Sequence, residues 1–220
     1  MDVLDLRPVL TFLRGLKANN NRAWFQANRA EFEEARGRFE AYIAALILKL
    51  PPSESLAGIT PKDCIFRLNR DLRFSKDKTP YKPYMSAYVA PGGRRTRRLG
   101  YYVHVEPGNR SMLGGGLHEP EPTQIAAWRA AIDQDPSALL RILGQRSFRE
   151  YFGQIDGERL KTAPKGYPRD HPQLNLLRLK KVIVTRHISD KEVSSPRLLA
   201  ETLTTFKTMR PFLRYLEAVV

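Results

Sequence analysis

Apolar residues recur at helical spacing in the first part of the chain. Pro8 suits the first turn of a helix, and the run Asn19-Asn20-Asn21 interrupts the pattern. The apolar stripe between them consists of Val9, Leu10, Phe12, Leu13 and Leu16. The spacing predicts a first helix, and an asparagine of the interrupting run is expected to cap the helix that follows.

A second apolar stripe begins after Arg22 and ends at Pro51-Pro52. Its members are Phe25, Phe32, Ala35, Phe39, Tyr42, Ile43, Leu46 and Leu50. The charged residues Arg29, Glu33, Arg36 and Glu40 fall on the opposite face. The periodicity already accounts for these aromatic residues and for Trp24, so we assign them to the core and not to a cofactor site.

The period changes to two in the middle of the chain. Residues 84–90, 99–105 and 111–117 are separated by the turns Pro91-Gly92-Gly93 and Pro107-Gly108-Asn109. These segments predict three neighbouring strands of an antiparallel meander, and residues 63–69 are expected to add a fourth.

Helical patterns return in residues 125–143, and a short strand is expected at Val182 to Thr185. A final helix is expected to start at Ser194 or Ser195 with Pro196, and Pro211 should break or kink it. The order of elements predicts an α+β fold, in which a central antiparallel sheet of about four to five strands packs with N-terminal and C-terminal helices. We expect residues 1–220 to form a single domain.

The composition is that of a folded protein without structural disulfides. The chain has 220 residues, of which 42% are hydrophobic and 10% aromatic, and it contains one cysteine. One cysteine excludes the disulfide-stapled secreted class. No segment approaches the roughly 20 apolar residues of a membrane span, and the start of the chain lacks a signal-peptide pattern. We therefore expect a cytoplasmic protein that does not insert into membranes.

The net charge of +14 is concentrated in two segments. Residues 62–98 hold eleven Lys or Arg against three Asp, and residues 159–186 hold eight against one. These two segments contribute +8 and +7, so the rest of the chain is close to neutral. Such a distribution indicates local sites for an anionic partner more than a generally basic surface.

The most distinctive part of the chain is the run RLNRDLRFSKDKTPYK from Arg67 to Lys82. Further distinctive blocks are Asn19 to Arg22 with Trp24-Phe25, Tyr101 to His104, Gly114 to Gly116, Leu160 to Tyr167, and His171-Pro172. Together they resemble a widespread family of bacterial and fungal proteins that is catalogued only as a domain of unknown function. The resemblance extends over nearly the whole chain, but the family brings no activity, cofactor or catalytic residue to carry over.

Two interpretations of the first basic segment stay open. So much positive charge in one place repels itself, and a bound anion would relieve the repulsion because Arg offers several planar donors to phosphate or carboxylate. Alternatively, Asp63, Asp71 and Asp77 pair with the cations in a network that only shapes the loop. The expected ligand-binding residues are Arg67, Asn69, Arg70, Arg73, Lys76, Lys78, Tyr81, Lys82, Tyr102, Lys161, Lys165 and His171.

Three classes of function fit these residues. The first is the binding of an anionic, phosphate-bearing ligand, possibly a nucleic acid that stacks on Tyr81, Tyr84, Tyr88 and Tyr101. The second is an enzyme that uses acid–base chemistry on a small phosphorylated or carboxylated substrate, for which Tyr102 and His104 share one face of a strand. The third is a structural or interaction protein whose charge aids solubility or meets an acidic partner.

Other familiar sites find little support in the sequence. The glycines at 114–116 fit a bulge or a tight strand crossing, and neither nucleotide-binding glycine motif is present. Cys64 is expected to be a buried, inert thiol. His118 with Glu119 and Glu121 is the only local metal candidate, without zinc-site spacing, so we expect no metal and assign no cofactor.

Overall fold

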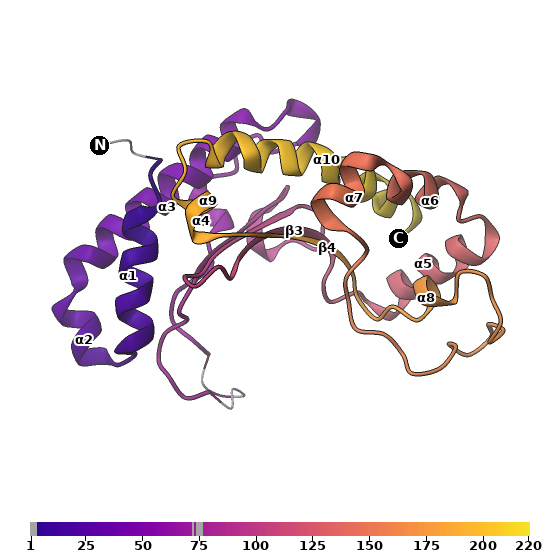
Figure 1. The fold of residues 1–220 in the computed structure, drawn as a ribbon, viewed down its shortest axis with the longest axis horizontal. Coiled ribbons are helices and arrows are strands. Elements are labelled where there is room, and N and C mark those ends of the chain that lie inside the picture. Colours follow the sequence, from indigo (N-terminus) through magenta and orange to yellow (C-terminus); the bar gives the residue numbers. More distant parts are fainter. Residues whose placement is uncertain (1–3, 72, 74–76) are drawn as a thin grey trace. The chain divides into compact units, whose positions relative to one another are not determined.

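The computed structural model describes residues 4–71, 73 and 77–220. Four strands form one open sheet in the order β1-β2-β3-β4, accompanied by helices from both ends of the chain (Figure 1). The predicted α+β class with its central antiparallel sheet is confirmed, and the sheet has four strands in the described part of the chain.

The strands are β1 (Met85–Val89), β2 (Tyr101–Val105), β3 (Ser111–Leu117) and β4 (Val182–Ile188). The helices are α1 (Arg7–Ala18), α2 (Arg22–Ala27), α3 (Arg29–Lys49), α4 (Pro61–Cys64), α5 (Pro122–Gln134), α6 (Ser137–Gly144), α7 (Arg146–Phe152), α8 (Leu174–Leu177), α9 (Asp190–Val193) and α10 (Leu198–Val219). Two short 3-10 helices are η1 (Pro52–Glu54) and η2 (Gly93–Arg95).

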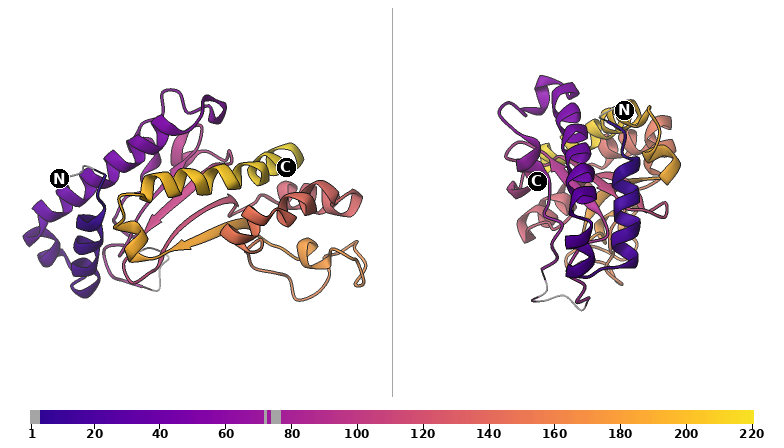
Figure 2. Two further views of the ribbon diagram at one scale, coloured as in Figure 1. Left: turned by 45° about the horizontal axis from the view of Figure 1, so that its top comes forward. Right: turned by 90° about the vertical axis from the view of Figure 1, so that its left-hand side faces the viewer.

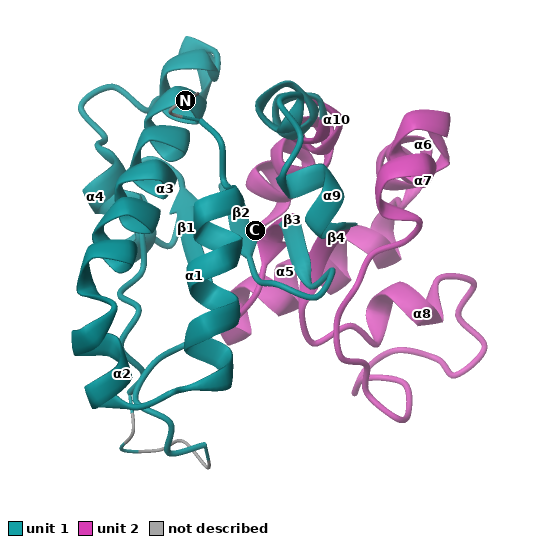
Figure 3. Ribbon diagram, turned by 60° about the vertical axis from the view of Figure 1, so that its left-hand side comes forward, with its two compact units in different colours: residues 1–113, 187–204 teal, residues 114–186, 205–220 magenta. Residues whose placement is uncertain are grey.

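The chain divides into two compact units, which Figure 3 shows in different colours. Unit 1 comprises residues 1–113 and 187–204, and unit 2 comprises residues 114–186 and 205–220. The basic segment 62–98 belongs to unit 1, whereas the basic segment 159–186 belongs to unit 2. We therefore describe the two segments separately, and the expectation of a single domain stays a prediction.

The N-terminal helices of unit 1 follow the predicted apolar stripes. All five residues of the first stripe are buried in α1, which packs against α3 (Figure 2). The Asn21 side chain caps α2 by accepting a hydrogen bond from the Trp24 N–H at 2.9 Å, as predicted. The second stripe is also buried, but it spans two helices, because Asn28 ends α2 and its side-chain amide donates back to the Trp24 carbonyl.

The exposed face of α3 carries the predicted charges as ion pairs. Arg29 pairs with Glu33 at 2.5 Å and Arg36 pairs with Glu40 at 2.8 Å, each one helical turn apart. Gly37 lies on the same exposed surface, and a methyl group added there would meet no atom within 4 Å. This glycine therefore lowers helix propensity without serving a close contact.

Replacing Gly37 with Ala is expected to raise the free energy of unfolding by about 0.5 to 1 kcal/mol, because alanine loses less backbone entropy in a helix. Urea denaturation measures the change. Gly58 is the matched control, since an added methyl group also has open space there but φ is +77°. Gly58→Ala should lower the stability by about 1 kcal/mol, and a gain at that position would contradict the argument.

The two strands of unit 1 place different chemistry on the two faces of the sheet. β1 and β2 are antiparallel, with Ala87 opposite Val103 in the core and Ser86 opposite His104 on the other face. The first face is continued by Met85, Val89, Tyr101 and Val105, which are all buried. The predicted alternation is confirmed, and it lines up polar side chains on the second face.

The strand predicted for residues 63–69 is wrong. Pro61 to Cys64 form the short helix α4, because Pro61 suits a first-turn position and the Asp63 carboxylate accepts hydrogen bonds from the Thr60 N–H and hydroxyl at 2.9 and 2.6 Å. The following residues contribute only isolated bridges, from Ile65 to Ala87 and from Asn69 to Tyr81.

Cys64 ends α4 and is fully buried, as predicted for an inert thiol, although not in a strand. Burial raises the pKa of this thiol to about 11, so the reactive thiolate is scarce at neutral pH. None of the described helices combines the length and the apolar character needed to span a membrane.

Two glycines of β3 lie close to the backbone of the neighbouring strand β4. A methyl group on Gly114 would lie 2.9 Å from the Val184 carbonyl oxygen of β4, and one on Gly116 would collide with the Val182 carbonyl. The predicted tight strand crossing is therefore confirmed. In the C-terminal helix, α10 continues through Pro211 without the break that was one of the two expected outcomes, and the expected kink stays a prediction. The buried Met209 and Phe212 on either side supply packing that offsets the lost backbone hydrogen bond.

Candidate functional site

The basic loop of unit 1 is anchored at Tyr81. The Asn20 side-chain amide donates to the Tyr81 carbonyl at 2.9 Å and accepts from the Tyr81 N–H at 3.1 Å, as a neighbouring strand would. The Tyr81 ring stacks on Phe25 at 4.3 Å and is buried. These contacts give Tyr81 a positioning role in the loop, and its role in ligand binding stays a prediction.

Two backbone hydrogen bonds draw the ends of the basic loop together. The Arg70 N–H donates to the Pro80 carbonyl at 3.0 Å, and the Lys82 N–H donates to the Leu68 carbonyl at 2.9 Å. The Lys82 ammonium also donates to the Arg67 carbonyl at 3.1 Å. Residues fifteen positions apart in the sequence therefore meet at one junction, where the charges of Arg67 and Arg70 lower the pKa of the Lys82 ammonium.

Some of the loop cations have carboxylate partners. Asp71 accepts two hydrogen bonds from the Arg73 guanidinium at 3.0 and 2.7 Å, and these bonds hold the pKa of Asp71 far below its usual value. Asp71 also lies 3.7 Å from Arg67, and Asp77 lies 2.9 Å from Arg70. The proposed loop network thus exists for Asp71 and Asp77, but exposed pairs of this kind stabilise little.

Lys82 differs from these cations. Its ammonium lies 5.9 Å from the ring centroids of both Phe66 and Tyr84, and no carboxylate pairs with it in the part of the chain that the structure describes. Burial lowers the pKa of Lys82, and the charges of Arg67 and Arg70 lower it further. We call Arg67, Arg70 and Lys82 the cation cluster.

The remaining predicted residues of this loop are not assigned to the cluster. Arg73, Lys78 and Asn69 are exposed, and Lys76 lies outside the described residues. The Asp63 carboxylate caps α4, and no ion pair links it to Arg67, Arg70 or Lys82 in the part of the loop that the structure describes.

A chain of three polar side chains lies on the second face of the sheet, on and just after β2. The Tyr102 hydroxyl is 3.0 Å from His104 Nδ1, and His104 Nε2 is 3.2 Å from Glu106 Oε2. We call Tyr102, His104 and Glu106 the relay. Because a carboxylate can only accept, the Glu106 contact favours a proton on Nε2, which leaves Nδ1 to accept the Tyr102 proton.

Two of the three relay residues are buried. His104 is 5% and Glu106 7% exposed, and the Tyr84 ring lies against the imidazole in a tilted arrangement, with the ring centroids 4.3 Å apart. Burial lowers the pKa of His104, against the opposing effect of Glu106, and burial raises the pKa of Tyr102. The second carboxylate oxygen, Oε1, pairs with Arg110 at 3.1 Å and with Lys17 at 3.7 Å.

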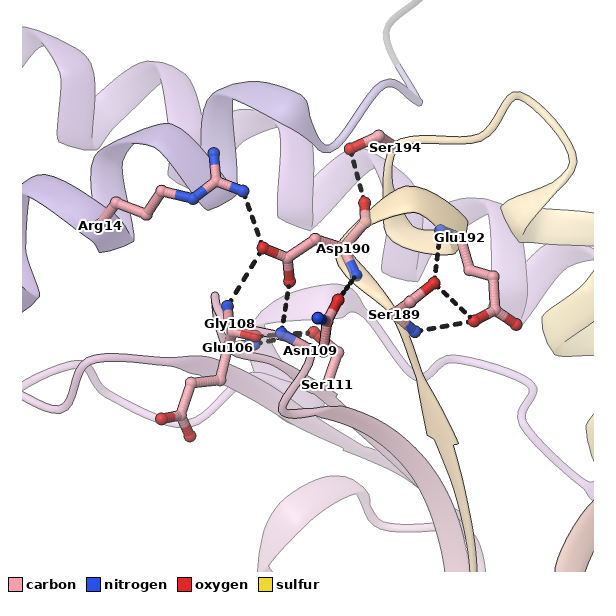
Figure 4. Close-up of polar contacts among 9 residues, drawn as sticks. All are labelled: Arg14, Glu106, Gly108, Asn109, Ser111, Ser189, Asp190, Glu192 and Ser194. Atoms are coloured by element: carbon pink, nitrogen blue, oxygen red, sulfur yellow. Dashed lines mark hydrogen bonds and ion pairs between the residues drawn. The ribbon is translucent and has the colours of Figure 1, made fainter.

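The turn after β2 is held by Asp190 of α9. The Asp190 carboxylate accepts from the N–H groups of Gly108 and Asn109 at 3.1 and 3.0 Å and from Arg14 at 2.7 Å (Figure 4). The Asn109 side chain accepts in return from the Asp190 N–H at 2.9 Å. Figure 4 shows the Glu106 carboxylate directed away from Asp190, so one turn fixes the backbone while leaving that carboxylate to the relay.

Tyr84 connects the cation cluster with the relay. Its ring centroid lies 5.9 Å from the Lys82 ammonium and 4.3 Å from the His104 ring centroid. Both groups of residues belong to unit 1, so their arrangement follows from one compact body. A ligand held by Lys82 would therefore lie one aromatic ring away from the relay.

Two arginines of the second basic segment donate to backbone carbonyls of unit 2, and a third contacts an aromatic ring. Arg159 donates to the Ile155 carbonyl at 3.1 Å, and Arg178 donates to the Leu160 carbonyl at 2.5 Å. Arg186 lies over the Tyr151 ring at 4.6 Å. Long irregular segments need such donors because their carbonyls have no regular partner.

The three predicted site residues of unit 2 do not resemble the cation cluster. Lys161 and Lys165 are exposed, whereas His171 is fixed in a turn, accepting from the Gln173 N–H at 3.0 Å and lying 3.3 Å from Asp133. Their role in ligand binding stays a prediction. Within the described ranges, no group of three or more His, Cys, Asp or Glu side chains is placed to hold a metal ion.

Sequence reasoning considered Tyr102 and His104 as a pair but missed Glu106. The signal was present, because residues 102, 104 and 106 share one face at a period of two. Lys17 and Asp190 had no such signal, since their contacts join segments far apart in the chain.

Comparison with known proteins confirms the predicted resemblance to a family of unknown function. No curated protein and no solved structure matches the chain. Residues 8–215 match the model of a family described as conserved hypothetical protein (DUF2461), and because this match covers nearly all of the 220 residues, the chain belongs to that family.

Proposed function

We propose that the protein binds a small phosphate-bearing anion at the cation cluster of unit 1. The observation that supports this proposal most is the Lys82 ammonium, which is partly buried beside two arginines without a carboxylate partner among the described residues. Bringing these three cations together costs free energy that Asp71 and Asp77, which pair with the two arginines, offset only in part. A bound anion would remove that cost.

The donor types of the cluster suit a phosphate group. Guanidinium groups offer paired donors in a plane, and an ammonium adds a compact charge with three donors. Arg70 also has a buried Nε donor with no acceptor in the described part of the chain, so its hydrogen-bonding capacity is not exhausted by Asp77. Phosphate oxygens accept several hydrogen bonds at once and would satisfy such donors.

A small ligand suits the cluster better than a nucleic acid. Binding along a nucleic acid backbone requires cations spread over several phosphates, and stacking requires exposed aromatic rings. The cluster instead gathers at one junction, and Tyr81 and Tyr101 from the predicted stacking set are buried. We therefore propose a compound carrying one phosphate group or a few adjacent ones.

Titration calorimetry with inorganic phosphate tests the proposal. The wild-type protein should bind phosphate, and Lys82→Gln should bind at least about tenfold more weakly, because one charge-assisted hydrogen bond contributes about 1.5 to 3 kcal/mol. Lys49→Gln is the matched control, since it removes the same charge at the exposed end of α3 in the same unit.

Two outcomes would contradict this function. Equal weakening in both variants, or no heat of binding at all, would show that the cluster is not a phosphate site. Fluorescence anisotropy with a labelled 20-nucleotide strand tests the alternative ligand, a nucleic acid. Tight binding that inorganic phosphate does not displace, with a steep dependence on salt, would indicate an extended polyanion site and overturn the proposal for a small ligand.

A further inference from the structure

The relay has the arrangement that activates a hydroxyl group. A hydroxyl, an imidazole and a carboxylate follow one another at 3.0 and 3.2 Å, and the imidazole nitrogen that faces the hydroxyl is the one free to accept a proton. The same order of groups activates the nucleophile in hydrolases that use a serine, a histidine and an aspartate. Here the hydroxyl is phenolic, and it belongs to the half-buried Tyr102.

Packing alone does not account for the relay. His104 and Glu106 are more than nine-tenths buried, and removing ionisable groups from water costs free energy that apolar side chains of similar size would not require. Both side chains are buried on the face of the sheet opposite to the core residues Val103 and Val105. Costly buried polar groups beside a cation cluster are typical of a reaction site.

We propose that Tyr102 is the catalytic residue of an acid–base site that acts on the ligand of the cation cluster, with His104 as its proton acceptor and Glu106 as a positioning residue. This inference rests on the proposed function for the identity of the ligand. It adds a reaction class, namely proton transfer to or from a small phosphorylated compound.

The proton transfer balances within the relay. As a base, the Tyr102 oxygen takes a proton from a hydroxyl group of the ligand while its own proton moves to His104 Nδ1. Tyr102 therefore stays neutral, the ligand oxygen becomes an alkoxide, and the positive charge forms on the imidazole beside the Glu106 carboxylate. The reverse transfer, from His104 through Tyr102 to the ligand, makes the same residues an acid.

The geometry places the developing charges next to opposite ones. The imidazolium lies 3.2 Å from Glu106, and Arg110 and Lys17 occupy the other oxygen of that carboxylate, which keeps the side chain in place. The alkoxide forms on a ligand whose phosphate is held by the cluster. Tyr84 is the shared neighbour of the two groups, with its ring centroid 5.9 Å from the Lys82 ammonium and 4.3 Å from the His104 ring centroid.

The rate at which Tyr102 reacts with an arylsulfonyl fluoride, measured against pH by mass spectrometry, tests the relay in the wild-type protein. In this reaction the phenolic oxygen bonds to sulfur, fluoride leaves and the proton passes to His104. Neutral His104 is required, and burial keeps its pKa below 6.5. The rate should therefore rise below pH 6.5 and level off above it.

Tyr88 serves as an internal reference, because it lies on the same face of the sheet and its hydroxyl donates to the Arg98 carbonyl at 3.0 Å. Around pH 7, Tyr102 should react about 10²-fold faster than Tyr88, the lower range for assistance by a general base. A Tyr102 rate no greater than that of Tyr88, or one that climbs tenfold per pH unit up to pH 9 as for an unassisted phenol, would overturn the relay.

Variants then separate the relay from the anion site. Glu106→Gln should lower the plateau rate of Tyr102 and leave Tyr88 unchanged, and an unchanged plateau would remove Glu106 from the mechanism. Inorganic phosphate should slow labelling of Tyr102 in the wild type but not in Lys82→Gln. Fast, pH-dependent labelling that phosphate does not affect would support the activated hydroxyl while contradicting the proposed anion site.

Discussion

Asp190→Ala is expected to lower the free energy of unfolding by about 4 kcal/mol. The carboxylate accepts from a guanidinium and from two backbone N–H groups, and hydrogen bonds to a charged group contribute about 1.5 to 3 kcal/mol each. The variant leaves the turn at Gly108 and Asn109 without its acceptor. Urea denaturation followed by Trp24 fluorescence, in a Trp128→Phe background, reports the change in unit 1.

Asp5→Ala is the control for Asp190, because the hydrogen bonds that Asp5 accepts among the described residues come from Arg7, two residues away, and its loss should cost about 1 kcal/mol. A similar small effect for Asp190→Ala would contradict the role of that residue in joining distant segments.

The pH dependence of stability provides a second readout for Asp190. Burial raises the pKa of the carboxyl, but the hydrogen bonds from Arg14, Asn109 and Gly108 outweigh it, so the pKa of Asp190 in the folded protein lies below its usual value. A lowered folded pKa means that this stabilisation is complete above pH 3.8 and is lost as the pH falls through the folded pKa. The difference between wild type and Asp190→Ala should therefore shrink in strong acid.

Gly116→Ala is expected to destabilise unit 2 by about 4 kcal/mol. An added methyl group would collide with the Val182 carbonyl and lie 3.0 Å from the Ile183 Cα, and the backbone φ of +121° disfavours any side chain. Strain at such a position costs about 1 to 3 kcal/mol, and overpacking adds a similar amount. Trp128 fluorescence in a Trp24→Phe background measures the loss, because Trp128 is fully buried in unit 2.

Gly144→Ala is the matched variant in the same unit, since a methyl group there meets nothing within 4 Å. Its effect should stay within about 0.5 kcal/mol. Equal effects at the two glycines would mean that the close approach of β3 to β4 is not what requires Gly116.

Regular periodicity made the helices of unit 1 and the strands of the sheet predictable. The α1 stripe and the alternation in β1 and β2 each repeat several times, so one exception does not hide the pattern. The strand prediction for residues 63–69 failed because the alternating pattern there is short. Pro61 and the Asp63 cap act on four residues only, and they outweigh an alternation with few repeats.

Only part of the candidate site could be predicted from the sequence, and the reason is different. Basic residues in one segment were easy to count, but their usefulness depends on which carboxylates approach them in space. Asp71 satisfies Arg73 through neighbours in the chain, whereas Lys82 stays without such a partner in the described structure because the loop folds its ends together. The sequence therefore identifies the basic segment, but it does not show which of its cations lack a carboxylate partner in the folded chain.

The buried thiol of Cys64 has a practical consequence for labelling. With so little thiolate available, the single native cysteine should stay unmodified by a maleimide dye under native conditions. Leu48 of unit 1 and Leu140 of unit 2 are exposed, so cysteines introduced at these two positions would each accept a dye while Cys64 stays in place. Energy transfer between the dyes would then measure the distance between the two units in solution, with and without phosphate.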